Sequence, residues 1–73
     1  MNDVKIDQPA LVHYDTSDLE GVVAEVLRTR DGDVRQLVVR VLDDPSVNQS
    51  YLVRFVPFNG SWRSTGGHST LTV

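Results

Sequence analysis

Two long apolar runs, Glu20–Thr29 and Val34–Leu42, are joined at Asp31-Gly32, and this arrangement constrains the fold more than any other feature of the chain. Asp-Gly between β-branched runs is a strong signal for a tight hairpin with a type I′ turn, in which both central residues have a positive φ. The segment therefore predicts two long antiparallel strands and an all-β architecture.

A two-residue turn also fixes which residues face each other across the hairpin. Arg30 then faces Asp33, and three apolar pairs share one face because side chains alternate along a strand. These pairs are Val26 with Leu37, Ala24 with Val39, and Val22 with Val41. We expect this face to line the core. The full predicted core consists of Leu11, Val22, Ala24, Val26, Leu37, Val39, Val41, Val53 and Phe55.

Shorter runs predict further strands on both sides of the hairpin. They are Ala10–Tyr14, Tyr51–Phe58, a return through Ser61–Thr65 after the Asn59-Gly60 turn, and Ser69–Val73. Ser17-Asp18-Leu19-Glu20 fits a helix capping box, but the glycine and valines that follow are poor helix formers, so no helix is expected there. Short antiparallel strands at this spacing suit a small barrel that closes its own edges. We predict an SH3-like barrel of about five antiparallel strands with no substantial helix; an OB-fold is the alternative.

The chain is short and has no cysteine. Its 73 residues predict a single domain, with residues 1–8 as a flexible N-terminal arm or a short edge strand. The absence of cysteine favours a reducing, cytoplasmic setting. Met1–Asp7 lacks the apolar segment of a signal peptide, and no apolar run is long enough to span a bilayer, so we expect no membrane contact.

Charge is unevenly distributed along the chain, which has a net charge of −3. Residues 1–25 hold six acids and one base, whereas residues 26–73 hold six arginines and four aspartates. An acidic total disfavours a protein whose affinity comes mainly from neutralising phosphates. We therefore expect weak or no binding to nucleic acid.

The sequence holds no pattern typical of catalysis or metal binding. His13 and His68 are the only histidines, and without cysteine a zinc site would need both of them together with carboxylates. His13 lies in an expected strand and His68 in a Gly-rich turn, so we expect one half-buried and one solvated histidine. No nucleophile elbow, phosphate-binding loop or dinucleotide-binding glycine pattern occurs. We expect no enzyme activity, no metal and no cofactor.

Two groups of side chains are candidates for binding a partner. The predicted register places Arg28 opposite Arg35, with Arg30 beside them, and like charges in that position favour either hydration or an anionic partner. The second group is aromatic: Trp62 is predicted to face Pro57 near Arg63, and Tyr14 ends the first strand. Tryptophan, tyrosine and arginine dominate binding hot spots. The predicted partner-binding residues are Arg28, Arg30, Arg35, Tyr14, Trp62 and Arg63.

The segment Leu19–Val26, followed by a turn and a valine-rich strand, resembles a KOW motif, with the motif's glycine at Gly21. KOW motifs occur in SH3-like barrels of ribosomal proteins and transcription elongation factors. The resemblance implies the same barrel and a role in RNA binding. KOW domains are basic where they contact RNA, whereas the residues around Gly21 are acidic.

These observations favour a small stand-alone protein-binding regulator or inhibitor that docks on a larger protein or protein complex. One form of this hypothesis is a phage-type regulator of host transcription that acts on RNA polymerase. We expect such a protein to be a monomer. The alternative is a nucleic-acid-binding barrel of the KOW or Tudor type, with the arginines on phosphate and an aromatic ring on a base.

Overall fold

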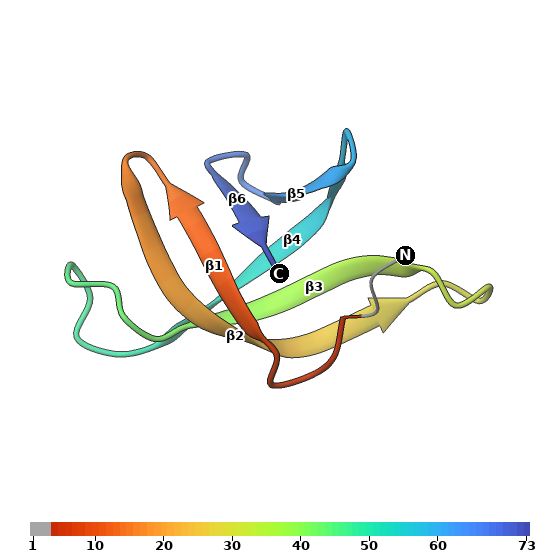
Figure 1. Cartoon of the computed structure of the whole chain (residues 1–73), viewed down its shortest axis with the longest axis horizontal. Coiled ribbons are helices and arrows are strands. Elements are labelled where there is room, and N and C mark those ends of the chain that lie inside the picture. Colours follow the sequence, from red (N-terminus) through yellow and green to blue (C-terminus); the bar gives the residue numbers. More distant parts are fainter. Residues whose placement is uncertain (1–3) are drawn as a thin grey trace.

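The computed structural model describes residues 4–73, and these residues form a barrel of six strands (Figure 1). The strands are β1 (Pro9–Tyr14), β2 (Ser17–Arg28), β3 (Val34–Val41), β4 (Tyr51–Phe58), β5 (Ser61–Ser64) and β6 (Ser69–Thr72). Neighbours in this order are antiparallel, and β6 pairs with β1 to close the barrel. The all-β, SH3-like barrel is confirmed. The strand count is six because both short strands after Gly60 take part in the ladder.

The long strand β2 takes part in two strand pairings and so allows the sheet to curve into a barrel. Its first half pairs with β1 and its second half with β3, and Gly21 has a partner on each side, Ala10 and Val41. A Cβ atom on Gly21 would lie 2.6 Å from the carbonyl oxygen of Arg40. The strands therefore approach so closely at this point that only glycine leaves room for them.

The predicted hairpin register is confirmed from Glu25 to Leu27 and wrong on both sides of this stretch. Val26 lies opposite Leu37 as predicted, but Ala24 forms a β-bulge that shifts the preceding residues of β2 by one position. The observed pairs there are Val23 with Val39, Val22 with Arg40, and Gly21 with Val41. A bulge places the residues beyond it on the opposite face. Val23 is therefore fully buried, whereas Val22 and Ala24 are only partly buried.

The tip of this hairpin is a three-residue loop, Arg30–Gly32, and the predicted type I′ turn is wrong. The Thr29 N–H donates to the carbonyl of Asp33 at 2.7 Å, and the Gly32 N–H donates to the carbonyl of Thr29 at 3.0 Å. Gly32 has a φ of 92°, whereas Asp31 is not among the residues with a positive φ. Asp-Gly suits both turns, because each of them needs a left-handed residue at the glycine.

The loop geometry predicts unequal effects for two neighbouring substitutions. Gly32→Val should lower the free energy of unfolding by about 1–3 kcal/mol, because a β-branched residue is strained in the left-handed region. No atom crowds this position, so the strain is purely one of backbone conformation. Asp31→Asn should change the stability little. Urea denaturation of both variants tests this, and equal midpoints would rule out the left-handed conformation at Gly32.

The core is a single cluster of apolar side chains inside the barrel. Its buried members are Val4, Ala10, Val12, Leu19, Val23, Leu37, Val39, Val41, Phe55 and Leu71. The predicted residues confirmed in this cluster are Leu37, Val39, Val41 and Phe55. Val26 and Val53 are partly buried and pack against it. The prediction is wrong for Leu11, Val22 and Ala24; for Leu11 the reason is that alternation in β1 places Ala10 and Val12 inside.

The segment before β1 packs against the barrel. Val4 is buried in the core, the Asp7 N–H donates to the carbonyl of Val23, and the Val23 N–H donates to the carbonyl of Gln8. Residues 4–8 therefore cover the bulge in β2. Residues 1–3 of the predicted N-terminal arm lie outside the described residues.

Candidate functional site

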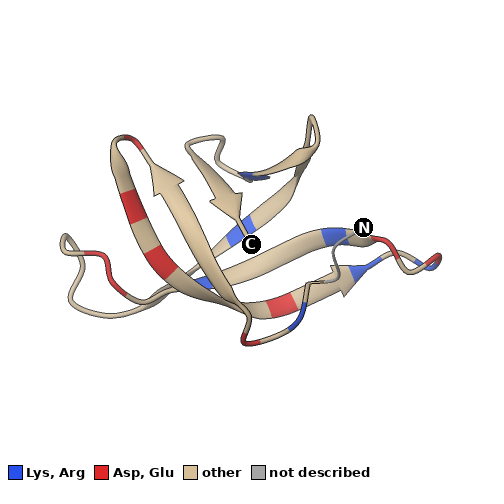
Figure 2. Cartoon of the chain, viewed as in Figure 1, with Lys and Arg blue, Asp and Glu red and all other residues tan. Residues whose placement is uncertain are grey.

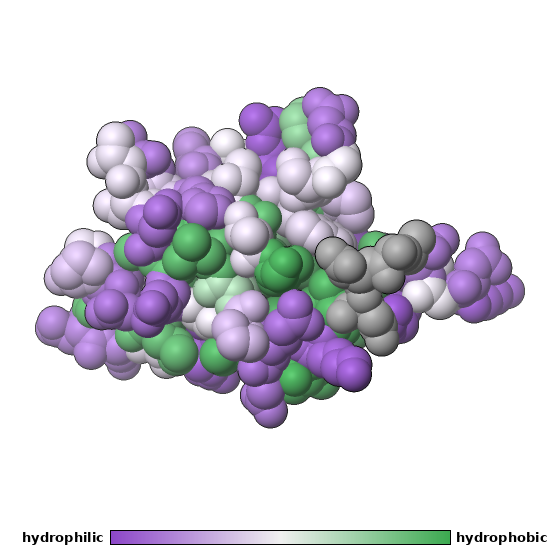
Figure 3. Space-filling model, in the orientation of Figure 1, coloured by the Kyte–Doolittle hydropathy of each residue, from purple (hydrophilic) through white to green (hydrophobic). Residues whose placement is uncertain are grey.

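An apolar hollow of about 540 Å³ lies on the outer face of β1, β2 and β6. Its apolar lining comes from Pro9, Ala10, Leu11, Val22, Leu42 and Val73. The same alternation that buries Ala10 and Val12 turns Leu11 outward, and Leu42 just after β3 is 54% exposed. Apolar residues gather in the middle of the face seen in Figure 3, over β1 and the end of the chain after β6. We call this site the outer hollow.

The rim of the outer hollow is polar and negative. Glu20 and Thr72 line it, and none of its lining residues is lysine or arginine. Asp18 lies two residues before Glu20 in β2 and therefore on the same face. Figure 2 shows acidic segments in the first half of β2, beside this site. An apolar group with a positive charge next to it complements such a surface.

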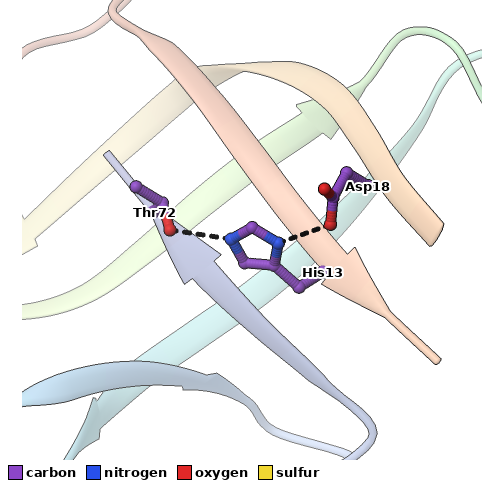
Figure 4. Close-up of polar contacts among 3 residues, drawn as sticks. All are labelled: His13, Asp18 and Thr72. Carbon is purple, nitrogen blue, oxygen red and sulfur yellow. Dashed lines mark hydrogen bonds and ion pairs between the residues drawn. The ribbon is translucent and has the colours of Figure 1, made fainter. Parts of the chain in front are cut away.

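Next to the outer hollow, the His13 imidazole connects three strands (Figure 4). Its Nδ1 is 2.7 Å from Oδ1 of Asp18 in β2, and its Nε2 is 2.7 Å from Oγ1 of Thr72 in β6. A neutral ring with its proton on Nδ1 donates to Asp18 and accepts from Thr72, and a protonated ring donates to both. Both protonation states therefore satisfy the two contacts. The expectation of a half-buried His13 is confirmed, since its side chain is 34% exposed.

A hydroxyl, an imidazole and a carboxylate connected in this order also form the catalytic group of acyl-transfer enzymes. In those enzymes the hydroxyl is the nucleophile, and free hydrogen-bond donors beside it stabilise the negative charge of the intermediate. Here Thr72 lies within the β1–β6 ladder, opposite Leu11, and its hydroxyl is held at the strand junction. We therefore interpret the three residues as a connection across the seam of the barrel. The sequence analysis missed it. A two-residue turn at Asp15-Thr16 would have placed His13 opposite Asp18, as the register does.

A second hollow, of about 300 Å³, is lined by residues of β1, β2, β4 and β6 and of the loop between β3 and β4. We call it the end pocket. Its lining consists of Val12, Tyr14, Leu19, Asp44, Ser46, Tyr51, Val53 and Ser69. Val12 and Leu19 belong to the core, so they give the pocket an apolar base, and two phenol rings and one carboxylate provide its functional groups.

Hydrogen bonds hold the polar groups of the end pocket in place. The Tyr51 hydroxyl donates to Oδ2 of Asp44 at 2.5 Å, and the N–H and hydroxyl of Ser46 donate to Oδ1 at 2.9 and 2.7 Å. These donors lower the pKa of Asp44 below its usual value. Burial, the hydrogen bond to Asp44 and the charge of Asp44 raise the pKa of Tyr51 to about 12, and the nearby Tyr14 adds to this.

The raised pKa of Tyr51 predicts an alkaline titration step. This pKa is above that of tyrosine in the unfolded chain. The contribution of Tyr51 to the free energy of unfolding is therefore fully present below about pH 10 and is lost as the pH rises towards 12. Absorbance titration of the folded protein should show one tyrosine ionising near pH 12. Tyr51→Phe should remove that step and Tyr14→Phe should keep it. Complete tyrosine ionisation by about pH 11 in the wild type would contradict the assignment.

The arginines predicted at the hairpin tip are exposed, but the predicted pair is wrong. Arg28 lies opposite Val34, because a second irregularity in the register makes Arg35 the extra residue of β3. The Arg28 guanidinium donates to the carbonyl of Gly32 at 3.0 Å. Arg28, Arg30 and Arg35 are therefore neighbours at one end of the molecule, without the direct Arg28–Arg35 opposition that the type I′ turn implied.

The other predicted binding residues lie in two further regions. The pairing of Trp62 with Pro57 is confirmed, and Trp62 is partly buried against the core. Arg63 lies over the ring of Phe58, 4.2 Å from its centroid. Tyr14 is in the end pocket, near the β1–β2 turn. The hairpin tip, the β4–β5 hairpin and the end pocket are different corners of the fold, so the six residues do not form one site (Figure 1).

Residues 4–73 show neither a metal site nor a membrane-spanning helix. This range contains no group of three or more histidine, aspartate or glutamate side chains placed to hold a metal ion. Within the same range, no helix is long and apolar enough to cross a membrane. Comparison of the chain with models of protein families, with curated proteins and with solved structures found no match. The outer hollow and the end pocket are therefore the candidate binding sites.

Proposed function

We propose that the chain is a protein-binding module that docks on a larger protein through the outer hollow. The observation that carries this proposal is the exposed apolar lining of that hollow, to which Leu11, Val22 and Leu42 contribute. Apolar surface gathered at one concave place is typical of binding sites. The proposed action is that of a regulator or inhibitor, which works by occupying a surface of its partner.

The negative rim indicates the chemistry of the partner. Glu20 lines the outer hollow and Asp18 lies beside it, so a partner segment with basic residues next to its apolar anchor is favoured. A phosphate backbone is disfavoured at the same place. We therefore propose as occupant an extended or helical segment of a larger protein that presents leucine-like side chains flanked by lysine or arginine.

The exposed arginines at the hairpin tip extend this proposal to a second contact. Arg30 and Arg35 would meet acidic groups of the same partner and mainly raise the association rate. RNA polymerase is the first larger machine that we would test, and the cytoplasm is the proposed location, since the chain has no cysteine.

The second candidate function, a nucleic-acid-binding barrel, is favoured by one observation. Three arginines share the hairpin tip, and Arg63 stacks on an exposed aromatic ring in the β4–β5 hairpin. Few phosphate contacts are available to so small a set, so we expect only nonspecific affinity, about 10⁻⁴ to 10⁻⁶ M at physiological salt. Fluorescence anisotropy with single- and double-stranded DNA and RNA measures it. A submicromolar, sequence-selective complex would reverse the order of the two proposals.

Amide NMR can test the docking proposal with a synthetic peptide of alternating leucine and lysine. We expect the peptide to shift the amide signals of Leu11, Val22 and Leu42 in a saturable way. Leu42→Asp should abolish these shifts, because it places a charge in the apolar lining. Leu52→Asp is the matched control, since Leu52 is 53% exposed and Leu42 is 54% exposed, but Leu52 does not line the outer hollow.

Three outcomes would count against the docking proposal. The first is a peptide that shifts only the hairpin tip, and the second is equal loss of binding in Leu42→Asp and Leu52→Asp. The third is a concentration-dependent shift at the outer hollow without peptide, which would mean that a second copy of the chain covers it. Purified RNA polymerase, captured by the wild type and not by Leu42→Asp, would identify the machine.

A further inference from the structure

The end pocket combines the groups that attract an organic cation. The aromatic rings of Tyr14 and Tyr51 and the carboxylate of Asp44 line the same hollow. An aromatic face attracts a cation through its quadrupole, and the attraction is strongest where the cation is partly removed from water. The core side chains Val12 and Leu19 at the base of the pocket supply such an apolar surface.

The carboxylate of Asp44 is a fixed negative charge with few free acceptor positions. Tyr51 donates to one of its oxygens, and the N–H and hydroxyl of Ser46 donate to the other. A primary ammonium carries three N–H donors and needs acceptors for them. A quaternary ammonium has no donors and needs only the negative charge and the rings. The hydrogen bonding of Asp44 therefore favours a ligand of the second kind.

The surroundings of the end pocket favour positive charge over negative charge. None of its lining residues is lysine or arginine. Figure 2 shows acidic segments in the β1–β2 turn and in the loop after β3, which are the connections next to this pocket, whereas basic segments lie in β3, β4, β5 and the β2–β3 hairpin. Its volume of about 300 Å³ is at the lower limit of ligand pockets, which suits one small head group.

We propose that the end pocket binds a quaternary ammonium group. Tyr14 and Tyr51 contact its methyl groups and Asp44 balances its charge. Two sources carry this chemistry: a free choline-like molecule and the side chain of trimethylated lysine in a peptide. The proposal does not rest on the outer hollow, since the lining residues of the two sites do not overlap.

NMR titration with choline tests the charge requirement directly. The comparison ligand is 3,3-dimethylbutanol, which has the same shape with a neutral carbon in place of nitrogen. We expect choline to shift the ring signals of Tyr14 and Tyr51 in a saturable way, with affinity in the millimolar range. The neutral ligand should bind at least about tenfold more weakly, because it loses the cation–π attraction and the attraction to Asp44.

Matched variants locate the ligand. Asp44→Asn should weaken choline binding about tenfold, whereas Asp43→Asn, which changes a neighbouring carboxylate outside the lining, should leave it unchanged. Tyr14→Leu should weaken it to a similar degree, and Phe58→Leu, at another exposed aromatic, should not. Tyr14 is 52% exposed, so this variant stays folded even if Asp44→Asn does not.

Peptides distinguish the two sources of the head group. A short peptide with trimethyllysine that binds more tightly than choline, while its unmodified lysine form does not bind, would indicate a protein ligand. Equal binding of choline and the trimethyllysine peptide would indicate a free small molecule. Equal binding of choline and 3,3-dimethylbutanol, no saturable shift at high choline concentration, or equal effects of Asp44→Asn and Asp43→Asn would each overturn the proposal.

Discussion

Gly21→Ala should destabilise the barrel by about 3 kcal/mol, a large part of the stability of so small a domain. The added Cβ would lie 2.6 Å from the carbonyl oxygen of Arg40 and 3.0 Å from Cγ1 of Val39. The first of these atoms belongs to the backbone of β3, and β2 pairs with a strand on both sides at this residue. Neither strand can move away without breaking a ladder.

Urea denaturation measures this effect, and Gly66→Ala is the matched control. A Cβ at Gly66 would meet only the His68 ring at 3.5 Å, an ordinary contact. Gly66 is also not among the glycines with a positive φ. The control should therefore be neutral or slightly stabilising, because alanine restricts the unfolded chain. Similar denaturation midpoints for the two variants would mean that β2 and β3 do not approach closely at Gly21.

Phe55→Ala should cost about 3–5 kcal/mol and leave the protein largely unfolded at room temperature. Phe55 in β4 is fully buried and lies between Leu37 of β3 and Ser64 of β5. Removal of its ring deletes the largest side chain of the core and leaves a cavity that the closed barrel cannot collapse to fill.

Thermal unfolding followed by circular dichroism tests this prediction, with Phe58→Ala as the control. Phe58 is 44% exposed, and its ring contacts the guanidinium of Arg63, so its loss should cost only about 0.5–1 kcal/mol. A melting temperature of Phe55→Ala close to that of Phe58→Ala would refute the position of Phe55 in the core. Phe55→Leu should lie between the two, since it retains part of the buried volume.

Sequence reasoning succeeded where the information was local. Asp31-Gly32 marked the hairpin. The pairing of Val26 with Leu37 came out as predicted because Arg35, the extra residue of β3, offsets the additional residue of the loop. It failed at Ala24, because a β-bulge depends on how the whole sheet must bend to close. The tip of the hairpin was also predicted wrongly, because a three-residue loop and a type I′ turn both accept a glycine.

The candidate sites were less predictable than the strands. The outer hollow collects residues from β1, β2, β6 and the chain after β3, which only the closed barrel brings together. The phase of β1 also decides whether Leu11 faces the core or the solvent, and a short apolar run such as Ala10–Tyr14 does not reveal it. Tyr14 was a candidate from its residue type alone. Its neighbours Tyr51 and Asp44 belong to a distant part of the sequence.

The alternation of side chains along β1 also affects how this protein can evolve. Ala10 and Val12 maintain the fold from within, while Leu11 and His13 belong to the outer surface of the same strand. A substitution at Leu11 can therefore change the chemistry of the outer surface while the packing of Ala10 and Val12 behind it stays unchanged. The outer surface of β1 can thus change by single mutations, without a compensating change in the interior.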